Sequence, residues 1–498
     1  MELPPSAAPL RALPADSLPS TVLSAVRDGS AGTADASAYL YEPAIAAGNA
    51  AALRACLPAW AEICYAVKAN GFAPILDALL SGLGIDGFEV SSTREVRLAL
   101  DAFDRVASRR RRLVSSGPAK SLALLTALAE TPDAVVNVES PGELHRLEGV
   151  AARLGRRVTV AVRVNPRQVR LTGSLQMGGR PSAFGVPEPE VPAVLELARR
   201  LPHVDVAGFH VHAVSANLDV PAHLDYVRWC LDFAERAARA ARMDLRLLDV
   251  GGGFGVPFEP DRKGERPFDL ARFGDGLSRL AVPTGVQMIF EPGRLLVADC
   301  GWYAAQVADV KRSYGTTFVV LRGGIHHFAL PTSWEIVHNF AVVNRNGPLL
   351  GDPGDQELAT GPNGSGDPGR GEDPGVRDPA GSGTTDQAGQ TDQAGPAGPA
   401  GPAEEREVAA TWPMAEVDTT GRAVTVVGEL CTPEDTLARD ITVGPVRTGD
   451  AVVFPMAGAY GYEFALAEFL GHARPRRVVL PPAGGRLRAP RSLPGAHE

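Results

Sequence analysis

Residues 158–252 read, in order, VTVAVRVN (158–165), PAVLELARRL (192–201), VAGFHVHA (206–213), DYVRWCLDFAERAARAA (225–241) and LRLLDVGG (245–252). The first, third and fifth runs are short, apolar and rich in Val or Leu, as is typical of buried strands. The second and fourth runs have apolar residues at helical spacing. Buried strands that alternate with amphipathic helices predict parallel β-α-β units.

The same alternation continues on both sides of this stretch. Further strand-like runs are EICYAVKA (62–69), DGFEVS (86–91), RRLVSS (111–116), AVVNVES (134–140) and VQMIFEP (286–292). Eight strands alternating with helices over residues 36–300 match the usual size of a (β/α)8 barrel, about 250 residues. The sequence therefore predicts such a barrel, and a doubly wound open sheet is the structural alternative.

The pattern changes after Cys300. The runs WYAAQVADVKRS (302–313), TFVVLRG (317–323), RAVTVVGELC (422–431) and DAVVFPM (450–456) alternate with a period near two, which predicts an antiparallel β domain. We expect it to span residues 301–350 and 405–485, and residues 1–35 could add a strand. Residues 351–404 lack aromatic side chains and contain TDQAGQTDQAG, so they are predicted to be a disordered insertion. Residues 486–498 form a tail.

Composition excludes several classes of function. The formal net charge of −9 argues against nucleic acid or an anionic membrane as the main partner. The five cysteines are widely spaced without a CxxC pair, which disfavours a disulfide scaffold or a structural zinc site. We find no signal peptide and no apolar run of about 18 residues. These observations predict a cytoplasmic protein with no membrane partner.

Chemically capable side chains follow the predicted strands, at the end where barrel enzymes place their active sites. Lys68 ends the first strand, where desolvation would suit it as a Schiff-base nucleophile, although a surface lysine is the alternative. His210 and His212 share a face of one strand. They could form a metal pair, or His212 could stack on a flat cofactor whose phosphate Ser215 holds, or they could be core histidines.

Two later strand ends carry further candidates. Gly251, Gly252 and Gly253 could wrap a phosphate with backbone N–H groups, although a plain tight turn has the same sequence. Glu291 could hold a pyridinium N–H and Arg294 a phosphate, whereas Pro-Gly alone would be an ordinary turn. In the β domain, Cys431 is either a proton donor or a buried structural thiol.

Taken together, the motifs YAVKAN, HVHAVS, DVGGGFG, EPGR, CTPED and GAYG resemble those of the fold-type III decarboxylases that use pyridoxal 5'-phosphate, which include the ornithine, arginine and diaminopimelate decarboxylases. The resemblance covers residues 36–350 and 405–485. It implies an alanine racemase-like barrel with a C-terminal β domain, a pyridoxal phosphate cofactor, no metal, and a homodimer that shares its active sites.

The resemblance also implies a role for each matching residue. Lys68 would bind the cofactor covalently, His212 would stack on its ring, and Glu291 would bond the ring nitrogen. Cys431 would act as proton donor, and Cys431 and Asp435 would reach into the site of the partner subunit. The phosphate would be held by Ser215, Gly251, Gly252, Gly253, Gly293, Arg294 and Tyr460. The substrate would be bound by Arg163, Thr432 and Asp435.

One motif departs from the pattern. Diaminopimelate decarboxylases read C-E-S-G-D where this chain reads CTPED, so Thr432 replaces the acid that meets the distal ammonium of the substrate. The segments MGGRPSAFG (177–185), RGGIHHFALPTSW (322–334) and FLGH (469–472) are more similar to a subgroup of siderophore and natural-product pathways, whose members decarboxylate larger conjugates such as citryl-amino acids.

Four alternatives stay open at this point. One is a diaminopimelate decarboxylase. The second is a racemase of the same fold, although those enzymes usually place Arg opposite the ring nitrogen. The third is a relative that binds partners without the cofactor, and the fourth is a metal-dependent hydrolase that uses His210 and His212.

Overall fold

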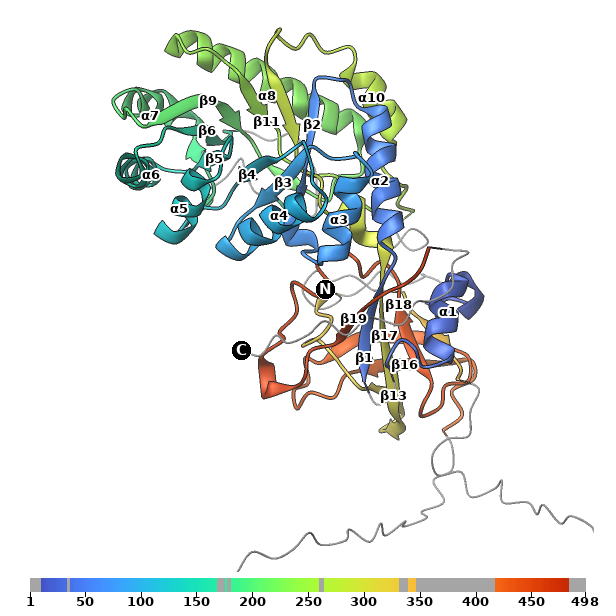
Figure 1. Ribbon diagram of the computed structural model, residues 1–498. Helices are drawn as coiled ribbons and strands as arrows, with labels where there is room; N and C mark the ends of the chain where they lie inside the picture. Colours follow the sequence, from blue (N-terminus) through green and yellow to red (C-terminus); the bar gives the residue numbers. More distant parts are fainter. Residues whose placement is uncertain are drawn as a thin grey trace, which may run out of the picture. The chain divides into compact units, whose positions relative to one another are not determined.

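The computed structural model describes residues 10–33, 36–167, 175–176, 181–258, 264–330, 339–345 and 417–482. The insertion predicted at 351–404 and the tail at 486–498 lie outside these residues. Helices and strands keep the labels of Figure 1.

Eight parallel strands form a closed barrel. Each strand pairs with the next along the chain, and β12 pairs with β2 to complete the ring. The closure confirms the predicted barrel and excludes the open sheet. The strands are β2 (Ala61–Ala66), β3 (Gly87–Val90), β4 (Arg112–Ser115), β5 (Val135–Val138), β6 (Val158–Asn165), β9 (Val204–His210), β11 (Leu247–Asp249) and β12 (Gln287–Phe290). The short β8 (Val186–Pro187) pairs beside β6.

Helices surround the outside of these strands (Figure 1). Several begin shortly after a strand with a side-chain cap: Ser92, Ser140 and Asp219 each accept a hydrogen bond from the backbone N–H three residues on. Capping fixes where the chain turns back, and so fixes the loops at the carboxyl ends of the strands. The helices are α2 (Pro43–Cys56), α3 (Ala73–Ser81), α4 (Thr93–Arg105), α5 (Leu122–Glu130), α6 (Pro141–Leu154), α7 (Val191–Ala198), α8 (Val220–Ala241) and α10 (Leu270–Leu277).

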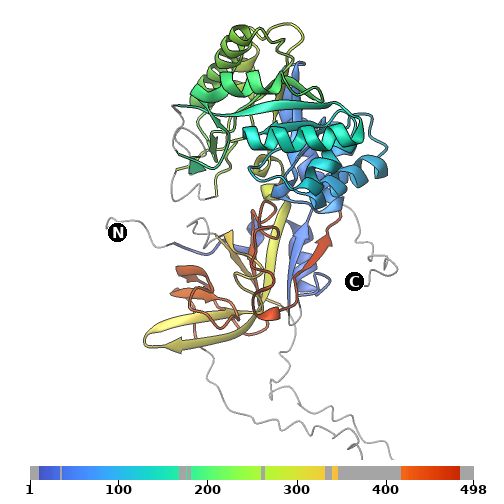
Figure 2. The same ribbon diagram turned by 90° about the vertical axis from the view of Figure 1, so that its left-hand side faces the viewer.

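The second part, here called the sheet domain, is built on one mixed sheet. Its main order is β15-β18-β13-β14-β16-β17, and β1 lies between β13 and β19. Most pairs are antiparallel, as predicted, but β14–β16 and β1–β19 are parallel. Figure 2 shows β13 and β14 as a long hairpin. The strands are β1 (Ser37–Tyr41), β13 (Gly301–Ser313), β14 (Thr316–Leu321), β15 (Ala341–Val343), β16 (Arg422–Val427), β17 (Thr436–Val443), β18 (Ala451–Phe454) and β19 (Arg476–Val479).

The described part of the amino-terminal segment contacts this sheet, and the strand predicted within residues 1–35 stays a prediction. Residues 10–33 contain the helix α1 (Ser20–Arg27) and make two isolated bridges, Arg11 to Thr442 and Leu13 to Ala341. The added strand is β1, which comes just after this segment and precedes the first barrel helix. No helix in the described ranges is long and apolar enough to cross a membrane.

Candidate active site

A layer of apolar side chains fills the inside of the barrel, and polar side chains follow it toward the carboxyl ends of the strands. The apolar layer is Cys64, Val114, Val135, Ala161, Ala207, Leu247 and Ile289. Because side chains alternate along a strand, the residue two positions later faces inward as well. Those positions hold Asn137 after Val135, Arg163 after Ala161, Asp249 after Leu247 and Glu291 after Ile289. Alternation therefore brings polar groups from distant parts of the sequence together at the carboxyl end of the barrel.

Lys68 lies at this carboxyl end of the barrel, but in the turn after the observed strand rather than in the strand that was predicted to include it. Strand β2 ends at Ala66, and Lys68 is in the following 3-10 turn (Val67–Ala69). Its Nζ donates a 2.6 Å hydrogen bond to Oε2 of Glu89, which is fully buried on β3. Partial desolvation in the barrel mouth lowers the pKa of Lys68, but the carboxylates of Glu89 and Glu291 outweigh it, so the net pKa is raised. The Lys68 side chain is 42% exposed, so a ligand can reach the amine.

Two buried carboxyls lie together across the barrel mouth. Burial, followed by the charge of Asp249, raises the pKa of Glu291 well above its usual range. Burial also raises the pKa of Asp249 to about 6, although hydrogen bonds to its carboxyl, first from Glu291 and then from the Gly251 N–H and the Asn137 amide, oppose the shift. Oε1 of Glu291 is buried and has no hydrogen-bond partner within the described residues. A ligand that carries an N–H would supply the missing donor.

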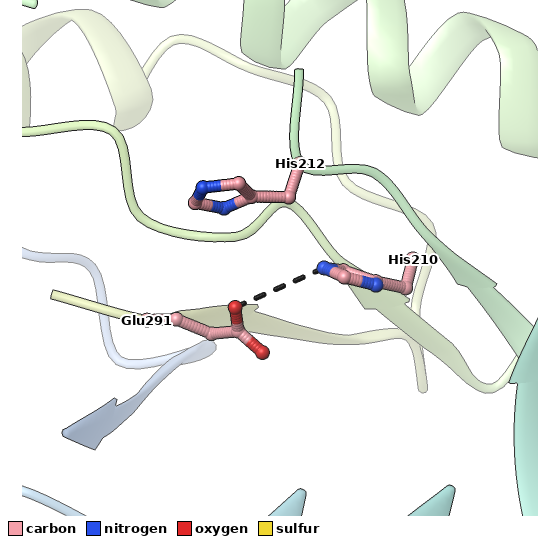
Figure 3. A group of neighbouring side chains, drawn as sticks. All are labelled: His210, His212 and Glu291. Atoms are coloured by element: carbon pink, nitrogen blue, oxygen red, sulfur yellow. Dashed lines mark ion pairs between the residues drawn. The ribbon is translucent and has the colours of Figure 1, made fainter. Parts of the chain in front are cut away.

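His210 and His212 face Glu291 in different ways. The three side chains point toward one another from the end of β9, the loop after it, and the end of β12 (Figure 3). Nε2 of His210 is 3.8 Å from Oε2 of Glu291, and His210 is fully buried. Nδ1 of His212 accepts a 3.2 Å hydrogen bond from the Gly252 N–H. Burial, with nearby cations, lowers the pKa of both histidines, so both rings are neutral at pH 7.

The glycines at 251–253 are required by close packing. Gly251 has φ +68°, and a Cβ there would lie 2.4 Å from Nδ1 of His212. A Cβ on Gly252 would lie 2.2 Å from the carbonyl oxygen of Glu291, and Gly253 has φ +85°. Side chains would therefore displace His212 and the segment after β12. The N–H groups of Gly251 and Gly252 already donate to Asp249 and His212, so the role predicted for these glycines in phosphate binding stays a prediction.

Arg294, Ser215 and Tyr460 form a second group beside the glycines. Arg294, at the start of α11 (Arg294–Val297), donates a 3.0 Å hydrogen bond to Oγ of Ser215 in β10 (Val214–Ser215). Its guanidinium carbon is 5.4 Å from the centre of the Tyr460 ring. A Cβ on Gly293 would lie 3.3 Å from the Tyr460 hydroxyl. A guanidinium, two hydroxyls and small residues make a suitable anion site.

Tyr460 comes from the sheet domain and has φ +61°. Its N–H donates to the carbonyl of Ala69, and the Asn70 amide donates to the carbonyl of Gly458. These bonds hold the turn after β18 against the turn that carries Lys68. The barrel mouth is thus completed by a segment about 390 residues further along the chain.

Arg163 already has partners within the barrel. Its Nη1 is 2.7 Å from Oε1 of Glu139, its guanidinium lies 4.7 Å from the centre of the Phe184 ring, and it is buried. Glu139 also accepts hydrogen bonds from the N–H groups of Gly117 and Gly185. The role of Arg163 in substrate binding stays a prediction.

The predicted residues of the sheet domain are placed differently. Cys431 is exposed, and the Thr432 hydroxyl donates to Glu434. Asp435 is buried, and its two carboxylate oxygens accept 2.8 Å hydrogen bonds from the N–H groups of Ile325 and Leu430. Asp435 therefore organises its own loop, and its predicted contact with substrate stays untested.

Glu89 and Asp249 are among the acids of the mouth that sequence reasoning missed. Both stand near the end of an otherwise apolar strand, in DGFEVS and LLDVGG. A lone acid in that position is expensive to bury without a partner, which is the signal that could have found them.

Comparison with known proteins decides the family. Residues 47–298, just over half of the chain, match the model of the pyridoxal-dependent decarboxylase, pyridoxal binding domain, and residues 396–458 match the C-terminal sheet domain of the same enzymes. The chain belongs to the pyridoxal-dependent decarboxylases. It is accordingly a carboxy-lyase that uses pyridoxal phosphate, as predicted. This excludes the cofactor-free relative and the metal-dependent hydrolase.

Several decarboxylases of known activity are similar to the chain. The 2-[(L-alanin-3-ylcarbamoyl)methyl]-2-hydroxybutanedioate decarboxylase of Staphylococcus aureus is 28% identical, over 85% of this chain and 89% of the relative. The L-glutamyl-[BtrI acyl-carrier protein] decarboxylase of Niallia circulans is 26% identical over 80% and 77%. The diaminopimelate decarboxylase of Aquifex aeolicus is 32% identical but covers 57% of this chain and 65% of the relative.

Solved structures of decarboxylases share the fold. Diaminopimelate decarboxylase of Helicobacter pylori, complexed with L-lysine, superposes with a TM-score of 0.66 at 22% identity, covering 89% of this chain and 91% of the other. The arginine decarboxylase of Paramecium bursaria Chlorella virus gives a TM-score of 0.66 at 16% identity, covering 92% and 100%.

The residues present fit pyridoxal phosphate. An accessible amine stands on Lys68, a buried carboxylate oxygen without a donor stands on Glu291, and the anion group around Arg294 and Ser215 lies beside the glycines. These three groups are chemically suited to bind, in the same order, the aldehyde, the ring nitrogen and the phosphate of the cofactor.

Proposed function

We propose that this decarboxylase acts on a carboxylated amino-acid conjugate in the biosynthesis of a siderophore or another secondary metabolite. The observation that carries the proposal is the match along most of both chains to the S. aureus enzyme, whose name describes an amino acid joined through an amide to a hydroxylated dicarboxylate. The L-glutamyl carrier-protein decarboxylase, also similar over most of its length, acts on a conjugate as well. The diaminopimelate decarboxylases match over a shorter part of the chain.

In this proposal Lys68 binds the cofactor and Glu291 fixes its ring. Pyridoxal phosphate, when bound, supplies the electron sink for loss of the carboxylate. Glu89 holds the Lys68 ammonium at 2.6 Å, so it orients the amine and controls when the amine loses its proton. Glu291 presents a buried oxygen to the ring nitrogen and keeps a proton there. A racemase is disfavoured because this position holds an acid rather than Arg.

The remaining cofactor contacts are assigned to the mouth residues described above. His212, a neutral ring held by the Gly252 N–H, would stack on the cofactor. Its phosphate would be held by Ser215, Gly251, Gly252, Gly253, Gly293, Arg294 and Tyr460.

The protonation step is assigned to the sheet domain. Cys431 Sγ would deliver a proton to the α-carbon of the substrate after carbon dioxide leaves. Because Cys431 is exposed on its own chain, we propose that it acts in the site of a partner subunit within a homodimer. We further propose that the enzyme works in the cytoplasm, since its five cysteines are free thiols.

Substrate choice is assigned to the segment beside Cys431. Thr432 is neutral, so it lacks the charge that would bind a distal ammonium, and its hydroxyl is occupied by Glu434. A substrate with a distal ammonium, such as diaminopimelate, gains little there. A conjugate with a carboxylated, hydroxylated distal end meets no acid at position 432 itself, and the neighbouring Glu434 carboxylate is engaged by the Thr432 hydroxyl.

The test is a comparison of carbon dioxide release from three substrates. These are the citryl amide of L-2,3-diaminopropionate, L-glutamate bound to an acyl-carrier protein, and meso-diaminopimelate. We expect a conjugate to give the highest kcat/KM, and Thr432→Glu to shift the preference toward diaminopimelate. Fastest turnover of diaminopimelate by the unaltered enzyme would refute the substrate class, and inversion at the α-carbon without carbon dioxide release would favour a racemase.

A further inference from the structure

Two histidines and a glutamate converge in the sheet domain, away from the barrel mouth. His326 follows β14, Glu429 follows β16, and His472 precedes β19. Because β14 and β16 are parallel neighbours, the segments after them lie at the same edge of the sheet. The Glu429 N–H donates a 3.0 Å hydrogen bond to the carbonyl of Gly323, which holds these two segments together.

The three side chains point their ligand atoms at one another. One ligand atom from each of them lies within 4.8 Å of the others. Oε1 of Glu429 is 3.8 Å from Nε2 of His326 and 4.0 Å from Nδ1 of His472. The centres of the two imidazole rings are 4.9 Å apart.

His326 is the independent indication of a ligand. It is fully buried, and neither ring nitrogen has a hydrogen-bond partner within the residues that the structure describes. An imidazole buried in this state leaves its polar atoms unsatisfied at a cost of about 1–3 kcal/mol. The side chain faces the Glu429 carboxylate, so the missing partner would lie between the two.

We propose that His326, Glu429 and His472 bind a divalent transition-metal ion, with Zn²⁺ as the expected occupant. Two imidazoles and one carboxylate are a donor set that zinc uses, with bonds of about 2.0–2.2 Å. Tetrahedral bonds of that length separate ligand atoms by about 3.4 Å. The two separations between Glu429 and the histidines exceed this by about half an ångström, and all three ligand atoms lie within 4.8 Å of one another, so rotation of the side chains can close the site. The carboxylate between the two rings disfavours an anion at the same place.

The frame around the three ligands is rigid, which favours metal binding. The Asp435 carboxylate accepts from the N–H groups of Ile325 and Leu430, the chain neighbours of His326 and Glu429. A third anchor holds the chain beside His472: Nε2 of His327 lies 2.8 Å from the carbonyl oxygen of Ala473. The backbone beside every ligand is thus fixed before the metal arrives.

The metal would act as a clamp on the segment that carries Cys431. Glu429 stands two residues before Cys431, so a bond from its carboxylate to an ion held by His326 and His472 would fix the exposed loop. Three protein ligands leave a fourth position for water. The inference concerns binding alone and does not depend on the proposed reaction.

The test is zinc binding by the cofactor-loaded protein after treatment with a chelator. Calorimetric titration with ZnCl2, together with elemental analysis, should give one ion per chain. His472→Gln and Glu429→Gln should each weaken binding by at least about a hundredfold, since loss of a mere outer-shell partner already costs about 10–100-fold. Circular dichroism checks the fold, and if one variant unfolds the other decides.

Two matched controls separate this site from others. His203→Gln removes a histidine of similar exposure, 36% against 34%, that also faces a glutamate, Glu148 at 2.8 Å. His212→Gln disables the other group of potential ligands, His210, His212 and Glu291. Both controls should keep the zinc. No zinc in the unaltered protein, undiminished zinc in His472→Gln, or loss in His212→Gln would overturn the proposal.

Discussion

Replacing Asp249 with Asn tests the idea that two buried carboxyls at the barrel mouth compete for charge. Burial raises the Asp249 pKa from its ordinary 3.8 to about 6, and it does so against hydrogen bonds that lower it. A carboxyl whose pKa is higher in the folded protein stabilises the fold below its unfolded pKa, and this stability is lost as the pH rises through the folded pKa. The difference of about 2.2 pKa units corresponds to about 3 kcal/mol at high pH, at 1.36 kcal/mol per unit.

The assay is urea unfolding of the cofactor-free protein and of Asp249→Asn from pH 4.5 to pH 8. Groups that do not interact with Asp249 titrate alike in both proteins, so they cancel in the difference between the two free energies of unfolding. We expect the variant to gain about 2 kcal/mol relative to the unaltered protein across this range, because part of the 3 kcal/mol is already lost at pH 4.5. Loss of the Asp249 charge also removes one cause of the raised pKa of Glu291, which changes the free energy of unfolding in the same direction.

The refuting result is a difference that stays constant, or falls, as the pH rises. A constant offset is expected in any case, since the amide introduced by Asp249→Asn cannot reproduce the bonds of the carboxylate to both Gly251 and Asn137. The sign of the offset is therefore uninformative. Only its change with pH reports on the buried charge.

Three other substitutions test the contacts of the mouth. Glu89→Gln removes the carboxylate that raises the pKa of Lys68, so the midpoint pH for cofactor incorporation should fall by about 1–3 pH units. Visible absorbance of the bound cofactor measures this midpoint, and a rise would contradict the pairing of Glu89 with Lys68. Arg294→Ala should weaken the cofactor by about 10–100-fold in a fluorescence titration, corresponding to about 1.5–3 kcal/mol for a charged hydrogen bond, and an unchanged Kd would remove Arg294 from the phosphate site. Gly251→Ala should lower the free energy of unfolding by about 1 kcal/mol or more, because φ is +68° and its Cβ meets His212; equal stability would show that the loop adapts.

Much of the barrel was predictable because its signal is local. Each predicted strand run overlaps an observed strand, since a buried parallel strand must be short, apolar and bounded by polar loops. The strand ends differ from the prediction: the run 62–69 predicts a strand through Lys68, but β2 ends at Ala66 and Lys68 lies in a turn. Pairing with the neighbouring strands decides where a strand ends, and one sequence does not show it.

Features that depend on distant contacts were out of reach. Strand β1 lies beside β13 and β19, whose sequences come more than 250 residues later. Glu89 meets Lys68 only because β2 and β3 are neighbours in the barrel. The cluster of His326, Glu429 and His472 spans about 145 residues of chain. Motifs find residues that stand near one another in sequence, whereas these groups exist only after folding.

The arrangement of carboxylates at the mouth explains why Glu291 is the acid left for the cofactor. Glu89 is paired with Lys68, and Glu139 with Arg163 and two backbone N–H groups. Asp249 accepts from Gly251 and Asn137. In the described part of the chain, Oε1 of Glu291 is the one buried carboxylate oxygen without a donor. The other acids already have hydrogen-bond donors, so a protonated ring nitrogen that enters the mouth forms its most favourable hydrogen bond with Glu291. Because the other carboxylates are paired within the protein, the orientation of the cofactor ring is set before any substrate binds.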